Sequence, residues 1–322
     1  MLRRPGTLVL LIVPLCLAAC DSETGPDGSE DVHFAYELGV SRRIWIPSSV
    51  PTDQSEGDAV SAADRMDVDW YNPEGAVLEG DLHPELPPEQ AAETRTVLKI
   101  AYASEGEESW AGVMRLLSSW SEKDFSDYDF VELWVNTGAP ISESAGFLRI
   151  ELGAISEDYY PLQDPNGVLD SEDVDVPPNG FDHDEDTGLD NVWGDDGAGI
   201  PGDDGDDDYF FEYGSDDYSN INGTENNDRL DTEDLNYNGY LDQDNAFWQL
   251  AIDLSDTTHL VQDNSQIVSG NDWRLYRVPL DAAVSVGGIV SWSAIESARF
   301  WVESLPVGEG ALLIGSLDVV RD

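Results

Sequence analysis

Apolar and polar residues alternate along eight short segments of this 322-residue chain. The segments are rich in Val, Leu, Trp, Phe and Tyr and end at Gly, Pro, Asn or Asp; they are residues 96–102, 109–117, 130–136, 146–155, 247–254, 273–280, 298–305 and 311–320. Alternation with period two between turn residues is typical of β-strands, and no segment has a convincing helical period. The pattern predicts an all-β fold, an antiparallel jelly-roll β-sandwich.

The strand pattern also predicts the domain organisation. Residues 32–95 hold short apolar pieces among Pro, Gly and Ser, which indicates an irregular lead-in that packs on the body with one or two strands. The β-sandwich domain follows over residues 96–322, interrupted by an insertion at 156–245. A stretch of this length without strands is either functional or disordered.

Alternation sorts the side chains of the predicted strands into two faces. One is aliphatic and predicts the core: Val131, Leu133, Val135, Leu148, Ile150, Leu152, Ala298, Phe300 and Val302. The other carries candidate ligand-binding residues: Glu132, Trp134, Arg149, Glu151, Arg299, Trp301 and Glu303. Flat aromatic rings beside guanidinium and carboxylate groups suit sugars. In the competing interpretation, the lead-in or the insertion covers this face, which is then a minor second core with cross-strand ion pairs.

The N-terminus has the pattern of an export signal. Residues 1–20 contain a basic start, an apolar run and the sequence Leu-Ala-Ala-Cys ending at Cys20. This pattern predicts a lipoprotein signal peptide with Cys20 as the lipidated residue, an ordinary cleaved signal being the alternative. The polar residues 21–31 are expected to be a flexible acidic tether. We therefore expect a lipid-anchored outer-membrane lipoprotein on the cell surface or the periplasmic face, although aspartate after the cysteine causes inner-membrane retention in other bacteria.

Charge narrows the choice of partners. The chain has 15 Lys and Arg against 67 Asp and Glu, a formal net charge of −52. Such a field repels nucleic acid and attracts cations, chiefly Ca²⁺, which takes oxygen ligands. The insertion alone holds 29 acidic residues with Arg229 as its one basic residue. We expect an ordered insertion to require bound cations, and Ca²⁺ is the predicted cofactor.

The strongest calcium motif begins at Asp234. Oxygen-bearing side chains occupy positions 1, 3, 5 and 9 with glycine at position 6, as in an EF-hand-type loop. The candidate ligands are Asp234, Asn236, Asn238, the carbonyl of Tyr240, Asp242, Asp244 and Asn245. Asn245 replaces the bidentate glutamate of position 12. Unless Asp244 substitutes for it, this replacement should weaken the affinity for Ca²⁺ toward a dissociation constant of roughly 10⁻⁴–10⁻³ M. The competing interpretation is a solvated loop of Asx turns.

Two further elements repeat the acidic spacing less closely. One comprises Asp182, Asp184, Asp186 and Asp190, with its glycine displaced by one position. The other is shorter and comprises Asp164, Asn166, Asp170 and Asp173. Both are candidate calcium loops, with solvated loops as the alternative. His183 lies among acids, but a lone histidine does not predict a zinc site.

Several motifs resemble one known family. These motifs are WAGVMR at 110–115, DF at 124–125, VELWV at 131–135, IELGAISED at 150–158, DTGLD at 186–190, VWG at 192–194, NGTENN at 222–227, DTEDLNYNGYLD at 231–242, WRLYRVPL at 273–280 and ARFWVE at 298–303. In this order, they are similar to motifs of the SprA family. Its members are giant outer-membrane translocon proteins of the type nine secretion system, linked to gliding motility. They are many times longer, so translocation cannot be transferred to this chain. The strands at 273–280 and 311–320 also resemble galactose-binding-like carbohydrate-binding modules at the level of fold.

The sequence contains no G-x-S-x-G, H-E-x-x-H, P-loop or dinucleotide-binding motif. The leading hypothesis is therefore a non-enzymatic envelope lipoprotein with a calcium-stabilised β-sandwich that binds a protein or glycan. A structural accessory of an outer-membrane secretion or adhesion assembly is the alternative. A glycoside-active enzyme is the third hypothesis, since paired carboxylates are unavoidable among so many acids.

Overall fold

Two antiparallel sheets form the body of the protein, for which a computed structural model describes residues 34–51, 60–75, 77–162, 165–194 and 207–322. The first sheet has the order β3 (Val68–Tyr71), β4 (Leu98–Ser104), β13 (Gly308–Arg321), β6 (Phe130–Asn136), β10 (Trp273–Pro279) and β9 (Leu260–Asp263), and β1 (Phe34–Glu37) pairs with β13. The second has the order β11 (Val284–Val286), β8 (Ala246–Asp253), β7 (Phe147–Ala154), β12 (Ser297–Glu303), β5 (Trp110–Leu116) and β2 (Ile46–Pro47). The signal peptide, Cys20 and the tether lie outside the described residues.

The predicted antiparallel jelly-roll β-sandwich is confirmed. All eight predicted strands are present, with ends shifted by at most three residues. Val131, Leu133 and Val135 are 0% exposed, and the predicted aliphatic residues of β7 and β12 belong to the same buried cluster. The alternation therefore identified the core side of each strand, because one face of each sheet packs on the other sheet.

The lead-in contributes more regular structure than its sequence suggested. It supplies β1 and β3 to the first sheet and β2 to the second. It also forms two helices of a single turn, α1 (Glu79–Leu82) and α2 (Pro88–Ala91), where no helix was predicted. A helix of four residues is too short to show a helical period of apolar residues in the sequence. The 3₁₀ helices of the described chain are η1 (Arg42–Ile44), η2 (Ala62–Asp64), η3 (Ile141–Glu143), η4 (Asn264–Gln266) and η5 (Leu280–Ala282).

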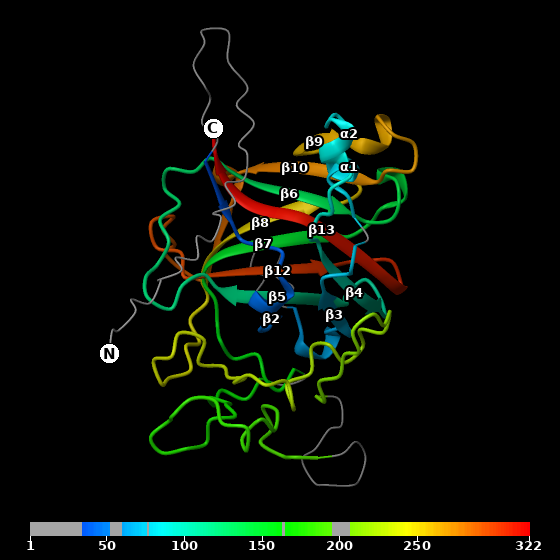
Figure 1. Cartoon of the computed structure of the whole chain (residues 1–322). Helices are drawn as coiled ribbons and strands as arrows, with labels where there is room; N and C mark the ends of the chain where they lie inside the picture. Colours follow the sequence, from blue (N-terminus) through cyan, green and yellow to red (C-terminus); the bar gives the residue numbers. More distant parts are fainter. Residues whose placement is uncertain (1–33, 52–59, 76, 163–164, 195–206) are drawn as a thin grey trace, which may run out of the picture.

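The insertion leaves and re-enters the sandwich at one point. It connects β7 to β8, which are neighbours in the second sheet with Ala154 opposite Ala246, so it emerges from one end of the sandwich (Figure 1, lower part). A small apolar cluster that includes Ile155, Tyr159 and Leu189 packs it against Met114 of β5. Gly287 has φ +77°, and an added Cβ would lie 1.7 Å from the carbonyl oxygen of Asn245, so the returning chain requires glycine there.

Three acidic residues lie side by side across the first sheet. Asp318 of β13 is opposite Glu132 of β6 on one side and Glu37 of β1 on the other. Burial, with the charges of Glu37 and Glu132, raises the pKa of Asp318 to about 6. Like charges opposed across strands are destabilising.

Replacing Asp318 with asparagine should therefore stabilise the fold above neutral pH. A carboxyl group with a raised folded-state pKa opposes folding fully above that pKa and not at all below its unfolded value. We expect Asp318→Asn to raise the free energy of unfolding by up to about 3 kcal/mol near pH 8 and by less than about 1 kcal/mol near pH 4. Urea denaturation at both pH values measures this difference. An equal effect at both would refute the electrostatic explanation.

Among the described residues, no helix combines the length and the apolar character needed to cross a membrane.

Candidate functional site

The candidate ligand-binding residues do not share one face, which corrects the sequence-based prediction. Glu132 and Trp134 lie on β6 of the first sheet, whereas Arg149, Glu151, Arg299, Trp301 and Glu303 lie on β7 and β12 of the second. Alternation reports the side of a strand but not the sheet to which it belongs. The seven residues therefore form two separate groups on opposite outer faces of the sandwich.

The lead-in covers part of each group. Trp134 packs with Leu82 of α1 and with Val77, Val97 and Trp273. On the second sheet, Glu151, Arg299 and Trp301 are each 0% exposed, and Arg299 Nη1 donates to the carbonyl oxygen of Ser49 at 3.3 Å. These side chains form minor cores, which agrees with the competing interpretation of the sequence.

Trp301 and Arg299 converge on one buried carboxylate. Glu151 Oε1 accepts from Trp301 Nε1 at 2.8 Å and from Gln249 Nε2 at 2.9 Å. Its Oε2 accepts from Arg299 Nε and lies 2.5 Å from Arg299 Nη2. Arg149 and Glu303 form a second, less buried ion pair at 2.6 Å. Buried polar groups that pair with one another in this way stabilise the covered sheet.

The loop that begins at Asp234 brings four predicted metal ligands together. Asp234 Oδ1 and Oδ2 accept from the backbone N–H groups of Asn238 and Gly239 at 2.8 and 2.7 Å. The side-chain amides of Asn236 and Asn238 each donate to Asp242 Oδ2 at 2.8 Å. Gly239 has φ +81°, which allows the sharp turn. Positions 1, 3, 5 and 9 thus meet at one place.

A carboxylate from elsewhere in the chain contacts the loop near its end, where Asn245 was expected to act. The Asn245 side chain is engaged outside the loop, where its Oδ1 accepts from Ser156 N at 3.2 Å. Glu157 comes close instead: its Oε2 accepts from Asp242 N at 3.3 Å, and its own N–H donates to Asp242 O at 2.8 Å. Glu157 is 3% exposed. Sequence spacing missed Glu157 because it lies just after β7, at the other end of the long β7–β8 connection from the loop. Asp244 and Tyr240 remain exposed beside the loop.

The other predicted calcium residues are regrouped by the fold. Asp173 Oδ2 accepts from Asn179 N and Gly180 N, and Asn179 Nδ2 donates to Asp175 and Asp182. Burial raises the pKa of nearby Glu185, and the charges of Asp175, Asp173 and Asp182 raise it further. One acidic cluster thus combines residues from both predicted elements, and the sequence analysis overlooked Asp175, Asn179 and Glu185. The alternation Asp-x-Asp at 173–175 was the available signal.

Three other predicted residues form contacts outside that cluster. Asn166 Nδ2 donates to Asp170 Oδ2 at 2.8 Å, and Asp190 Oδ1 accepts from Val192 N. Asp184 is exposed, and Asp164 lies outside the described residues. The four acids from Asp182 to Asp190 therefore do not form the single loop that their spacing predicted.

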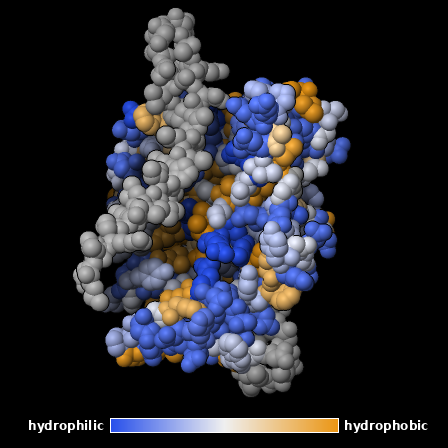
Figure 2. Space-filling model, in the orientation of Figure 1, coloured by the Kyte–Doolittle hydropathy of each residue, from blue (hydrophilic) through white to orange (hydrophobic). Residues whose placement is uncertain are grey.

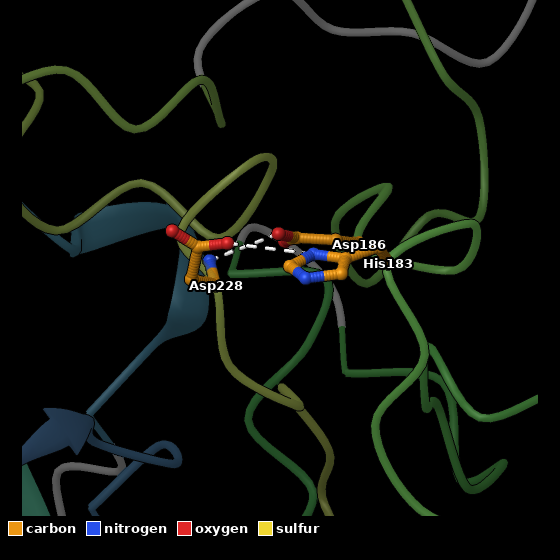
Figure 3. A group of neighbouring side chains, drawn as sticks. All are labelled: His183, Asp186 and Asp228. Atoms are coloured by element: carbon orange, nitrogen blue, oxygen red, sulfur yellow. Dashed lines mark hydrogen bonds and ion pairs between the residues drawn. The ribbon is translucent and has the colours of Figure 1, made fainter.

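His183, Asp186 and Asp228 form another group whose ligand atoms lie within 4.8 Å of one another. Figure 3 shows the His183 ring facing the Asp228 carboxylate, with an Nδ1–Oδ1 distance of 3.4 Å. Both oxygens of Asp186 accept backbone N–H groups, those of Asn227 and Asp228. The group is therefore built around a structural aspartate, with an exposed histidine next to it.

Asp186 belongs to a set of buried carboxylates that fix the backbone of the insertion. Glu233 Oε1 accepts from Tyr159 N and Tyr160 N, and its Oε2 accepts from Asp170 N. Glu172 similarly accepts from Gly188 N and Asp231 N. Each of these carboxylates joins segments far apart in sequence, so carboxylates here replace the sheet hydrogen bonds that loops lack.

Burying these carboxylates away from solvent disfavours their charged form. Burial, together with neighbouring acids such as Asp231, Asp242 and Asp170, raises the pKa of Glu172 to about 8 and those of Glu157 and Glu233 to about 7. Hydrogen bonds from backbone N–H groups act in the opposite direction. A positive ion near the Asp234 loop would offset part of this cost.

Two cavities adjoin the insertion. One, of about 450 Å³, is lined by Asn236, Asn238, Asp242 and Asp244 of the loop and by Glu122 and Glu296 of the sandwich. The other, of about 350 Å³, lies between the insertion and the lead-in segment around η1 and β2. The lead-in and the insertion are joined there: Tyr71 stacks on Tyr218 at 3.9 Å, and Trp70 exchanges two hydrogen bonds with the Asn222 side chain.

Comparison with known proteins gives distant likenesses in structure alone. No protein-family model matches the chain, and no curated protein matches it in sequence. Three solved carbohydrate-binding modules are similar: CtCBM11, studied in solution (9% identity, TM-score 0.36, covering 90% of this chain and 95% of that one), a family 30 module of a Clostridium thermocellum cellulosomal cellulase (8%, 0.32, 90% and 98%), and CBM28, specific for non-crystalline cellulose (8%, 0.32, 88% and 90%). The fold assignment itself rests on the two sheets, and the SprA likeness stays a resemblance of motifs.

Proposed function

We propose that this chain is a non-enzymatic binding protein of the bacterial envelope, anchored by lipid at Cys20, whose β-sandwich carries a calcium-stabilised insertion and binds a glycan or protein partner. The observation that carries the calcium part is the convergence of Asp234, Asn236, Asn238 and Asp242 with Glu157. This group supplies carboxylate and amide oxygens, the ligands that Ca²⁺ prefers. Glu157 provides the acidic group that Asn245 lacks.

Calcium would supply charge compensation in this proposal. The carboxylates of Asp234, Asp242 and Glu157 lie close enough for the first two to raise the pKa of the third. A divalent cation shared by them would hold the start and the end of the insertion together, since Glu157 follows β7 and Asp242 precedes β8. That position would tie the insertion to the sandwich.

Calorimetric titration of Ca²⁺ into the EDTA-treated chain tests the proposal. We expect binding with a dissociation constant of about 10⁻⁴ M or tighter, because the loop has a carboxylate in place of Asn245. Asp234→Ala should abolish binding at this loop. Asp216→Ala is the matched control, since it removes an exposed acid of the insertion and should leave binding unchanged. Equal calcium binding by the chain and by Asp234→Ala would overturn the assignment.

A further inference from the structure

The cavity of about 350 Å³ lies where the lead-in meets the insertion. Its volume is near the lower end of the range for small-molecule sites. Arg42 and Arg43 of η1 line one side, and Tyr209, Thr224 and Arg229 of the insertion line the other. Figure 2, in the orientation of Figure 1, shows a strongly hydrophilic patch at the place of β2, above the insertion, with apolar surface next to it. The site therefore exists only when the insertion is folded against the body.

The sign of the charge in this cavity is opposite to that of the protein. Three of the 15 basic residues of the whole chain line it, against two acids, Asp228 and Asp231. Burial lowers the pKa of Arg42, and the charges of Arg43 and Arg229 lower it further while Tyr209 opposes them. Arginines that lower one another's pKa are held close together in spite of their repulsion. A local net charge of 3 − 2 = +1 within a chain of −52 favours an anionic ligand.

Arg42 is positioned by the backbone, whereas Arg229 pairs with an acid of the insertion. Arg42 Nη1 donates to the carbonyl oxygen of Ile221 at 2.6 Å, which fixes the guanidinium without using an acid. Arg229 Nε lies 3.5 Å from Asp231 Oδ1, and its side chain is 44% exposed. Within the described ranges, Arg42 and Arg43 form no ion pair with a carboxylate. Guanidinium groups held in this way can form paired hydrogen bonds with the two oxygens of a carboxylate.

The rest of the lining favours a ring with hydroxyl groups. Trp45, Trp70 and Tyr159 form apolar parts of the wall, and Tyr209 and Thr224 bring hydroxyl groups to it. Phosphate groups would match the arginines as well, but they carry about −1.5 to −2 charges and are repelled more strongly by the acidic surroundings than a carboxylate with a single charge. A carboxylate on a hydroxylated ring fits all of these features.

We propose that this cavity binds a uronic acid residue of an acidic polysaccharide, with Arg42 and Arg229 contacting its carboxylate. The inference rests on the proposed binding function and names the ligand class for it. The test is calorimetric titration of the calcium-saturated chain with trigalacturonate, and with its methyl ester as a probe of the same shape without charge. Trigalacturonate should bind, and the ester should bind about tenfold or more weakly.

Variants of the arginines complete the test. Arg229→Gln should weaken trigalacturonate binding about tenfold or more. Arg42→Lys should weaken it too, because lysine keeps the charge but lacks the paired N–H donors of the guanidinium. Arg229 is half-exposed, so its variant should fold even if Arg42 variants do not. Arg321→Gln is the control, because it removes an exposed arginine of β13 whose acidic neighbour is Asp127; its affinity should equal that of the parent chain.

The outcomes separate this inference from the calcium proposal. Normal calcium binding without trigalacturonate binding would overturn the cavity assignment alone, and trigalacturonate binding without calcium binding would overturn the calcium proposal alone. Equal affinity for the acid and its methyl ester, an unchanged affinity of Arg229→Gln, or stronger binding of inorganic phosphate would each overturn the uronic acid assignment.

Discussion

Replacing Glu151 with alanine should lower the free energy of unfolding by about 3–5 kcal/mol. Glu151 and Arg299 are both fully buried, and the 2.5 Å ion pair between them is the means by which the protein tolerates a guanidinium there. Without the carboxylate, Arg299 remains as an uncompensated charge, and the indole N–H of Trp301 and the amide of Gln249 lose their acceptor. Removing one partner of a buried pair costs far more than the pair contributes.

Chemical denaturation of Glu151→Ala beside Glu303→Ala measures this effect. Glu303 forms a comparable cross-strand ion pair with Arg149 at 2.6 Å, but the two side chains are 19% and 15% exposed. Water can still reach these groups, so Glu303→Ala should cost about 1 kcal/mol. If both variants lose the same stability, the fully buried network does not have the structural role assigned to it.

Replacing Glu233 with alanine should locally unfold part of the insertion. Its carboxylate is 0% exposed and accepts three backbone N–H groups, those of Tyr159, Tyr160 and Asp170, at 2.7–3.0 Å. A buried donor left without an acceptor costs about 1–3 kcal/mol. We expect a loss of roughly 3 kcal/mol or more in local stability, with the sandwich intact because its own hydrogen bonds are unaffected.

Limited proteolysis with mass spectrometry locates this local unfolding. Cleavage of Glu233→Ala should accelerate within 156–245 and stay slow in the strands. Glu212→Ala is the matched control, because Glu212 is an exposed glutamate of the same insertion. Cleavage of Glu233→Ala at the control rate would show that this carboxylate does not hold the insertion.

Much of the sandwich could be predicted because burial imposes a period on each strand. The alternation of Val131, Leu133 and Val135 against Glu132 and Trp134 follows from the packing of one sheet on the other. The pattern could not reveal that Trp134 and Trp301 belong to different sheets, since strand order is a property of the whole topology. Nor could it find β9 and β11, which have four and three residues and are too short to show a period.

The candidate metal ligands likewise include some that the sequence predicted and some that it could not predict. Loop spacing is local, so the sequence predicted the grouping of Asp234, Asn236, Asn238 and Asp242. Glu157 lies 85 residues before Asp242, and only the pairing of β7 with β8 brings the two together. The buried carboxylates of Glu172 and Glu233 were overlooked. In the sequence, an acidic residue that accepts backbone N–H groups cannot be distinguished from one that is exposed to solvent.

Hydrogen exchange of the insertion with and without calcium tests the central claim most directly. Backbone N–H groups of the Asp234 loop and of the segment around Glu157 should exchange more slowly in saturating calcium than in EDTA, whereas the β6 and β13 amides should not change. Asp234→Ala should remove the difference. Identical exchange throughout 156–245 in the two conditions would contradict the claim that calcium organises the insertion.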